Sequence, residues 1–357
     1  MYDVTVRGAG IFGLSIAWIC LQRGASVRIV DPNGPGSGAS GGYVGALAPH
    51  VPENWNIKKS LQFQSLIQSE SFWQAIDDAS GLSSGYTRTG RIQPIADNHS
   101  LRLAHKRSHL ANDHWKGKAV WQIVETEDIP CLRIRSETGY FVHDTLSARV
   151  HPKDACRSLV GAIQNKGGQI ETEAKDQGAI VWATGVAGLH ALSAAVGCSV
   201  GRAVKGQAVL LQPTVALSPD LPQIFTDGIH IVPHANGTIA VGSTSENEFV
   251  DADAIDDQLD NVLARAQLTV PLLNDTAVIG RWAGLRPKAQ SRAPILGRWP
   301  DCSKHFIANG GFKIGYGLAP IVADMMADLV LENVNRIPNE FSIEASIDKA
   351  FRTRENA

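Results

Sequence analysis

Three glycines near the N-terminus constrain the fold more than any other feature of the chain. Gly8, Gly10 and Gly13 form a G-x-G-x-x-G pattern between an apolar stretch, residues 2–6, and a helical pattern that runs to about residue 23. In a β-α-β unit these glycines form a tight turn, let a pyrophosphate approach the backbone, and allow close packing of helix on strand. The chain is therefore predicted to begin with a Rossmann-like dinucleotide-binding unit.

An acidic residue stands where such a unit contacts a ribose. Asp31 ends a second apolar stretch, residues 25–30, and a carboxylate at this point accepts hydrogen bonds from the ribose hydroxyls of a dinucleotide. The glycine pattern alone is a weak signal, and an ordinary glycine turn is the alternative. The flanking strands and the acid favour dinucleotide binding.

Composition excludes several classes of protein. The 357 residues include 44% hydrophobic and 19% charged residues, so the chain can bury a large core and is neither disordered nor an integral membrane protein. Lys and Arg number 33 against 35 Asp and Glu, a net charge of -2, so no global charge attracts a nucleic acid.

The cysteines and the N-terminus bear on the compartment. Five cysteines are scattered without a C-x-x-C pair, which argues against a metal site or a disulfide framework and fits a reducing compartment: Cys20, Cys131, Cys156, Cys198 and Cys302. The chain enters a strand with no basic leader, and its long apolar stretch, residues 11–21, is too short to span a bilayer. We expect a cytoplasmic protein without a membrane span.

The remaining pattern predicts two interleaved domains. Helices are expected at 57–79, 100–114, 152–166, 253–266 and 319–334, and strands at 91–96, 120–125, 139–143, 180–183, 206–212 and within 229–242, 279–296 and 306–314. The fold class is α/β, or α+β overall. A discontinuous dinucleotide-binding domain, residues 1–80, 146–204 and 277–357, is interleaved with a substrate domain on a mostly antiparallel sheet, residues 81–145 and 205–276.

A second run of small residues, from Gly36 to Pro49, follows Asp31 and lets another backbone segment lie against a long cofactor. Here the chain resembles the FAD-dependent D-amino-acid oxidase superfamily, which includes glycine oxidase, sarcosine oxidase and D-amino-acid dehydrogenases. Further blocks that resemble this superfamily follow in order: Val181 to Gly185, Val204 to Gln207, Ile231 to Pro233 with Val241 to Thr244, Trp282 to Pro287 and Asn309 to Gly315.

The resemblance implies an FAD cofactor and a set of contacts to it. The segment 183–185 would pass the pyrophosphate and ribose, and the loop 309–315 would lie beside the isoalloxazine and stabilise its reduced anion. The implied cofactor-binding residues are Gly8, Gly10, Ile11, Phe12, Gly13, Asp31, Pro32, Ala39, Ser40, Gly41, Gly42, Gly45, Ala46, Leu47, Ala174, Ala183, Thr184, Gly185, Arg286, Gly310, Gly311, Phe312, Lys313 and Ile314.

Four residues are candidates for substrate contact. Arg286 matches the arginine that holds the substrate carboxylate in glycine oxidase, and a guanidinium suits this role because its fork donates two parallel hydrogen bonds. Lys313 matches a lysine that sarcosine oxidase uses at the carboxylate, and His230 stands where glycine oxidase has a tyrosine near the substrate. His50 directly follows the run of small residues from Gly36 to Pro49, which we call the flavin loop. Surface ion pairs for the two cations and structural roles for the two histidines are the alternatives.

The sequence departs from the superfamily at two places. The segment 168–180 is short where the family contacts adenine, and residues 172–174 are the candidate remnant. Sarcosine oxidase attaches its flavin to a cysteine, whereas this chain has Ser291 to Ala293 at the matching position and Cys302 falls later. We expect non-covalent FAD and no metal.

The resemblance implies an FAD-dependent oxidoreductase that oxidises the CH-NH bond of a small carboxylate-bearing amine, such as glycine, a D-amino acid or an N-substituted glycine, to an imine. Oxygen or a respiratory acceptor would take the electrons. The alternatives are a flavoprotein that oxidises a 2-hydroxy acid with His230 or His50 as base, a tRNA-modifying amine oxidase domain, and a non-catalytic flavin subunit.

The predicted mode of attachment can be tested directly. Acid precipitation of the purified protein is expected to release FAD into the supernatant, because no cysteine stands at the attachment position of sarcosine oxidase. The measurement is the flavin absorbance of supernatant and pellet. Yellow colour retained in the pellet would contradict the prediction.

Overall fold

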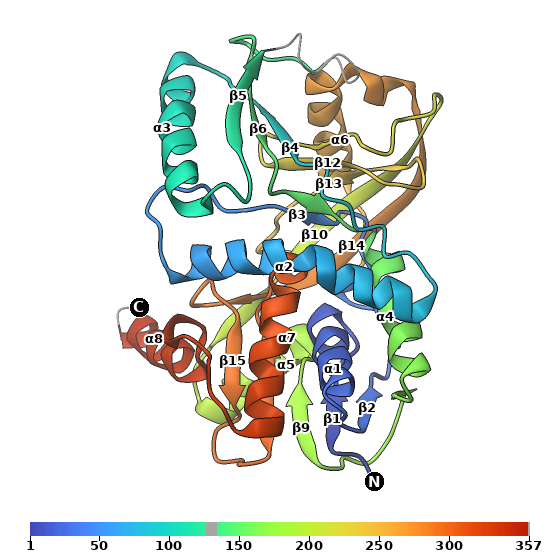
Figure 1. Ribbon diagram of the computed structural model, residues 1–357, viewed down its shortest axis with the longest axis vertical. Helices are drawn as coiled ribbons and strands as arrows, with labels where there is room; N and C mark the ends of the chain where they lie inside the picture. The colour runs from blue at the N-terminus through green and yellow to red at the C-terminus, as the bar shows by residue number, and fades with distance from the viewer. Residues whose placement is uncertain (126–133, 356–357) are drawn as a thin grey trace.

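The computed structural model describes residues 1–125 and 134–355, and Cys131 lies outside them. Its lower half in Figure 1 is built on a six-stranded sheet with the order β15-β16-β9-β1-β2-β8. All neighbours in this sheet are parallel except β15 and β16. The strands are β1 (Val4–Arg7), β2 (Val27–Val30), β8 (Gln169–Glu171), β9 (Ala179–Trp182), β15 (Ile295–Arg298) and β16 (His305–Asn309).

Helices cover this sheet. Nearly every residue of α1 (Ile11–Gln22) is buried, because α1 packs against α4 and α7. The other helices of this half are α4 (Pro152–Asn165), α5 (Gly185–Val196), α7 (Gly315–Glu332) and α8 (Ile343–Glu355). The long helix α2 (Ile57–Ser80) lies across the molecule between its two halves in Figure 1 and packs on α4 and α7.

The upper half contains an eight-stranded sheet with the order β14-β10-β13-β12-β11-β4-β6-β5. Its pairs are antiparallel except β4 with β11. The strands are β4 (Arg91–Pro94), β5 (Trp121–Glu125), β6 (Tyr140–Asp144), β10 (Gly201–Pro213), β11 (Gln223–Thr226), β12 (Ile229–Pro233), β13 (Ile239–Gly242) and β14 (Thr276–Ala289). The helices α3 (Asn98–Trp115) and α6 (Asp257–Thr269) belong to this half, and β3 (Ala46–Leu47) pairs with β7 (Ala148–Arg149).

The two faces of the eight-stranded sheet pack against different parts of the molecule. One face carries a hydrophobic core that α6 covers, with the members Ile92, Val209, Ile224, Ile231, Val241, Val262 and Ala266 among others. On the other face the register aligns Trp282, Ala208, Gly242, His230 and Phe225 on neighbouring strands. Small residues at the centre of this row let the loop after β2 approach, since a Cβ at Gly242 would lie 3.0 Å from the Val44 side chain. This face therefore meets the lower half.

The predicted fold class is confirmed, and the predicted helices at 57–79 and 152–166 match α2 and α4 within two residues. The helix predicted at 253–266 begins instead after Asp256, whose side chain accepts a hydrogen bond from the Gln258 N–H. The helix predicted at 319–334 begins at Gly315 and ends before Asn333, which adopts a left-handed conformation. The helices α5 and α8 were not predicted.

The predicted strands also need corrections. The segment 229–242 is a hairpin of β12 and β13, and 279–296 contains the end of β14, a turn and the start of β15. The strands predicted within 91–143, 206–212 and 229–242 all lie in one eight-stranded sheet, and β14 belongs to the same sheet. The domain division stays a prediction, and β14 lies in the eight-stranded sheet while β15, β16 and α7 lie in the other half.

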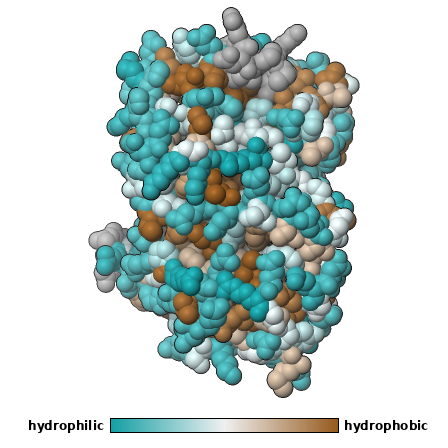
Figure 2. All heavy atoms as spheres, viewed as in Figure 1, coloured by the Kyte–Doolittle hydropathy of each residue, from teal (hydrophilic) through white to brown (hydrophobic). Residues whose placement is uncertain are grey.

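The surface seen in Figure 2 is mostly polar, with small scattered apolar patches. Within the described part of the chain, no helix combines the length and the apolar character needed to cross a bilayer. The cytoplasmic location stays a prediction.

Candidate active site

The glycine turn after β1 has the close contacts that its sequence pattern predicts. Gly8 has a φ of +104°, and a Cβ there would lie 2.4 Å from the carbonyl oxygen of Ala183. A Cβ at Gly13 would lie 1.9 Å from the Gly8 carbonyl oxygen. β1, β9 and α1 approach each other so closely at the carboxyl edge of the sheet that no side chain larger than a hydrogen atom fits at either position.

Polar side chains hold the neighbouring loops in place. The Asp31 carboxylate accepts hydrogen bonds from the backbone N–H of Ala9 at 2.8 Å and of Asn33 at 3.0 Å. The Ser40 hydroxyl accepts from the N–H of Ile11 at 2.9 Å, at the N-terminus of α1. The remaining N–H groups of the first turn have no intrahelical acceptor and form a site for an anion. The ribose contact of Asp31 stays a prediction.

Tyr316 connects the loop of Ser40 to two helices. Its hydroxyl, on the first turn of α7, lies 2.6 Å from the Ser40 carbonyl and 3.0 Å from that of Pro152, the first residue of α4. Burial raises the pKa of Tyr316 well above its ordinary value, so the hydroxyl remains protonated and can donate. Burial also raises the pKa of the adjacent Cys156 thiol to about 11, which keeps it protonated.

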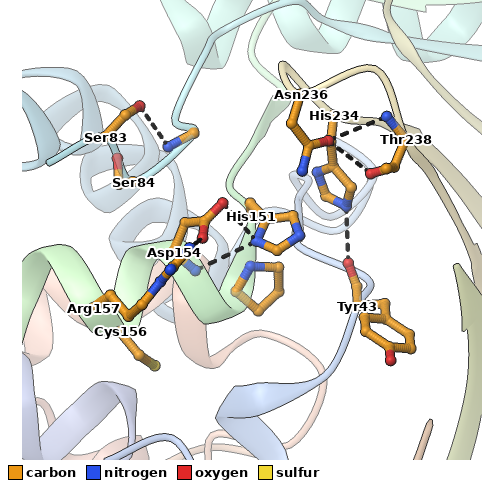
Figure 3. A network of polar contacts seen from close by, with 12 residues as sticks. Tyr43, Ser83, Ser84, His151, Asp154, Cys156, Arg157, His234, Asn236 and Thr238 are labelled. Carbon is orange, nitrogen blue, oxygen red and sulfur yellow. Dashed lines mark hydrogen bonds and ion pairs between the residues drawn. The ribbon is translucent and has the colours of Figure 1, made fainter. Parts of the chain in front are cut away.

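A histidine pair fixes the next part of this loop (Figure 3). The Nε2 atom of His234 donates to the Tyr43 carbonyl at 3.0 Å, since a carbonyl only accepts. The ring of His151 lies edge-on to His234 with centroids 4.7 Å apart, and its Nδ1 is 2.9 Å from Asp154 Oδ2. Burial, with a contribution from His151, lowers the pKa of His234 to about 3. The neutral pair thus anchors the loop to the turn between β12 and β13.

The C-terminal loop 309–315 is held from two directions. The Asn309 amide donates to the Gly185 carbonyl at 2.8 Å and accepts from the Gly310 N–H at 2.7 Å. The Phe312 N–H donates to the Pro287 carbonyl at 3.2 Å. The loop is therefore connected both to the start of α5 and to the strand that carries Arg286.

Arg286 is buried without a carboxylate partner. Its side chain is 8% exposed, and Nη1 donates to the Thr244 carbonyl at 3.1 Å. No ion pair to Arg286 is found within residues 1–125 and 134–355. The guanidinium lies across Gly206, where a Cβ would be 1.9 Å from Nη2. Burial lowers the pKa of Arg286 to about 10 against an opposing effect from the charge of Glu246, which forms no ion pair with it, so Arg286 stays a cation at neutral pH.

Lys313 and His230 belong to the same electrostatic neighbourhood. Loss of hydration, followed by the positive charges of Arg286 and Lys288, lowers the pKa of Lys313. Burial, followed by the charges of Arg91 and Lys313, lowers the pKa of His230 to about 3. His230 Nδ1 is buried and has no hydrogen-bond partner in the part of the chain described. Its ring packs at 4.7 Å against Phe225.

His50 has a different environment. The Gln62 amide oxygen accepts the His50 backbone N–H at 2.8 Å, and the Gln62 amide nitrogen donates to the Ala48 carbonyl at 3.1 Å. The side-chain oxygen of Gln62 also faces His50 Nδ1, which must therefore carry a proton and donate. Neutral His50 then has Nε2 as its acceptor. No hydrogen bond or ion pair joins His50 to Arg286 or Lys313 among the residues described.

The sequence of this chain matches a known protein family. The family model described as FAD dependent oxidoreductase matches residues 3–329. The chain belongs to this family. It is 24% identical to glycine oxidase of Geobacillus kaustophilus, over 92% of this chain and 93% of that protein. It is 26% identical to the bifunctional protein ThiO/ThiG of Trichormus variabilis over 92% of this chain. This chain spans about half (53%) of the length of that relative.

Solved structures agree with the fold. The crystal structure of glycine oxidase from Geobacillus kaustophilus superposes with a TM-score of 0.82 at 23% identity, over 96% of this chain and 98% of that one. Iminodiacetate oxidase from Chelativorans sp. BNC1 has a TM-score of 0.82 at 22% identity, over 95% and 98% of the two chains. The predicted family, enzyme class and FAD cofactor are confirmed.

The residues of this FAD dependent oxidoreductase fit the cofactor. Dinucleotides bind at the carboxyl edge of a parallel sheet. Four features lie along this edge here: the turn without side chains at Gly8 and Gly10, the free N–H groups of α1, and the fixed loops 40–45 and 309–315. Cys302 is exposed and precedes β16, at the opposite edge of the sheet. No group of three or more metal-ligating side chains is found in the described residues.

The structure does not test the other predicted cofactor contacts individually. Ala174 follows β8, and its carbonyl accepts from Arg7 at 2.9 Å, so the predicted adenine segment lies beside β1 and β2. Sequence reasoning missed the supports of the loops, namely Tyr316, His151, His234 and Gln62. No local pattern identifies Tyr316 and His234, because their partners lie more than a hundred residues away, whereas Gln62 contacts His50 only 12 residues away. Gly206, on which the Arg286 guanidinium lies, belongs to the block Val204 to Gln207 that resembles the superfamily, and this block was the sequence signal for it.

The glycine turn generates a prediction for cofactor retention. Gly10→Val is expected to abolish FAD binding, because even a Cβ at this position lies 3.2 Å from Ser40 Oγ and branched methyl groups would fill the space beside the α1 N-terminus. The measurement is the ratio of flavin to protein absorbance in the purified variant. Gly24→Val is the matched control, since no heavy atom lies within 4 Å of a Cβ there, although its φ of +87° imposes backbone strain. A normal flavin content in Gly10→Val would contradict the assignment.

Proposed function

We propose that this enzyme oxidises the CH-NH bond of a small amine that carries a carboxylate, such as glycine, a D-amino acid or an N-substituted glycine, to the imine. The observation that carries the proposal is the buried Arg286, which forms no ion pair with any described residue and lies beside a loop that fits the flavin. A buried unpaired charge is unfavourable unless a ligand compensates it. A substrate carboxylate supplies that compensation.

The surroundings of Arg286 suit a bidentate grip. Thr244 accepts from Nη1 only, so the Nε and Nη2 donors have no partner among the described residues. Gly206 lets the guanidinium lie flat on the sheet, which restricts its orientation. Two parallel hydrogen bonds would fix the direction of the carboxylate and therefore the position of the adjacent carbon.

The residues of the chain bind and orient the substrate and exclude water. Arg286 holds the carboxylate, and the positive charges of Arg286 and Lys313 disfavour a protonated amine nearby, which helps to keep the amine neutral. The bound FAD supplies the hydride acceptor. No side-chain base is needed once the amine is neutral. The imine hydrolyses in water to a carbonyl compound and ammonia or an amine, and oxygen or a respiratory acceptor takes the electrons.

The names of relatives and neighbours support an amine substrate. Glycine oxidases and iminodiacetate oxidase are joined by L-amino acid deaminase from Proteus vulgaris, with a TM-score of 0.80 at 17% identity. Each name denotes a carboxylate-bearing amine. Their low identity to this chain supports the class of substrate and not a particular compound.

A 2-hydroxy acid is the second candidate, because oxidation of an alcohol needs a base for the hydroxyl proton. The observation that favours it is the free Nε2 acceptor of neutral His50, fixed by Gln62. The absence of a contact between His50 and Arg286 among the described residues weighs against it, and so does the pKa of about 3 for His230, which makes that imidazole a weak base.

Arg286→Lys is expected to lower kcat/KM by roughly 10- to 1000-fold, about 1.4 to 4 kcal/mol, because lysine keeps the charge but loses the fork. The measurement is anaerobic flavin reduction across substrate concentration, with an amino acid and its amide. Arg265→Lys, in an exposed pair with Asp227, is the control. If wild type and Arg286→Lys discriminate equally between acid and amide, the carboxylate subsite does not exist.

The pH dependence separates the two candidates. With an amine substrate, kcat/KM is expected to rise with pH through the ionisation of the substrate amine and to show no histidine inflection near neutrality, since the pKa of His230 is about 3 and burial lowers that of His50. The measurement is the pH profile of wild type and His50→Ala. An inflection on the acidic side of neutrality that disappears in His50→Ala would favour the 2-hydroxy acid, because burial lowers the pKa of His50.

A further inference from the structure

Four cations gather at the end of the sheet that carries Arg286. Arg202 and Lys288 are direct partners in the register of β10 and β14, and Arg286 lies two residues before Lys288 on the same face of β14. The ammonium groups of Lys288 and Lys313 lie 5.3 and 5.7 Å from the centre of the Phe312 ring. We call Arg202, Arg286, Lys288 and Lys313 the cation cluster.

One carboxylate, Glu246, acts on Arg286 through its charge, but it lies 3.7 Å from Lys205 and forms no ion pair with the cluster. None of its four members makes an ion pair within the residues that the structure describes. The contrast with Lys205 is direct, because this lysine of β10 points to the opposite face and lies 3.7 Å from both Glu246 and Asp256. Like charges directly opposite each other destabilise a sheet, so Arg202 and Lys288 need a reason outside the fold.

One substrate carboxylate does not balance this charge. Under the proposed function, Arg286 takes the carboxylate next to the amine, and a reduced flavin anion would balance one more cation near the loop of Lys313. The positive charges of Lys288 and Arg202 are then still unbalanced. Because this chain has a net charge of -2, the excess is local and belongs to this surface.

We propose, on the basis of the proposed function, that the substrate is a dicarboxylate amine whose second carboxylate binds Lys288, with Arg202 at the outer edge. Arg286 and Lys288 lie on the same face of β14, and the Arg286 guanidinium lies over Gly206, on the side away from Lys288. A substrate that reaches both cations needs an acidic group at each end, as in an N-carboxyalkyl amino acid or an acidic amino acid. Lys288 is half-buried and Arg202 is exposed, so the second carboxylate lies toward solvent.

The alternative is that Lys288 acts on the flavin. Its contact with Phe312, in the loop that lies beside the isoalloxazine under the family resemblance, makes this alternative concrete. A cation that stabilises the reduced flavin changes its redox potential and affects all substrates equally. A cation that binds a second carboxylate changes only the preference between substrates.

The experiment uses the FAD-loaded enzyme and three variants, Lys288→Met, Lys288→Arg and the control Lys304→Met, an exposed lysine before β16. Anaerobic flavin reduction is measured with glycine and N-methylglycine as monoacids and with N-(carboxymethyl)glycine and D-aspartate as diacids. Perturbation of the flavin spectrum by acetate and by malonate, which are not oxidised, measures binding without turnover. The flavin midpoint potential is measured for each protein.

Wild type is expected to prefer diacids and to bind malonate more tightly than acetate. Lys288→Met is expected to lower the ratio of diacid to monoacid kcat/KM about 10-fold, and Lys288→Arg and Lys304→Met are expected to retain it. An unchanged ratio in Lys288→Met overturns the inference, as does a shifted potential with equal losses for both acid classes. If no amine reduces the flavin while malonate binding still depends on Lys288, the amine reaction is wrong and the dicarboxylate subsite stands.

Discussion

The close approach of the first glycine turn to β9 is the contact on which the site depends. Gly8 meets the backbone of Ala183 at a distance that no Cβ permits, and these residues are joined by the parallel pairing of β1 with β9. This pairing places the chain segments after β1, β2, β9 and β16 along one edge of the sheet. The cofactor loops converge because those strands are parallel.

The second sheet contributes a complementary surface. Its face toward the cofactor half has small residues where the loop after β2 approaches, and it carries Arg286 on β14. Burial of that guanidinium without an ion pair among the described residues reduces the stability of the fold, and under the proposed function the substrate carboxylate compensates for this. The opposite face of the same sheet has an ordinary apolar core under α6. Function and stability are thus assigned to different faces of one sheet.

The supports of the site cross between distant segments. Tyr316 reaches Ser40 and Pro152, and His234 reaches Tyr43, so α4, α7 and the β12–β13 turn together hold the flavin loop. Each contact joins residues more than a hundred positions apart. Sequence periodicity carries no information about such pairs. The same holds for part of the cation cluster, because Arg202 meets Lys288 through the register of β10 with β14, and the hydrogen bond from Phe312 to Pro287 joins the loop of Lys313 to β14.

The sequence alone determined three features: the alternation of strand and helix at the N-terminus, the glycine spacing and the order of the family blocks. These features depend on local backbone geometry and on short motifs. The identities of Arg286 and Lys313 were available for the same reason. The membership of β4 to β6 and β14 in a single sheet could not be read from the sequence, nor could the environment of His50, a loop residue whose partner Gln62 lies on α2. Burial, pairing and charge compensation depend on which segments meet in space, and here long-range packing of the two sheets controls them.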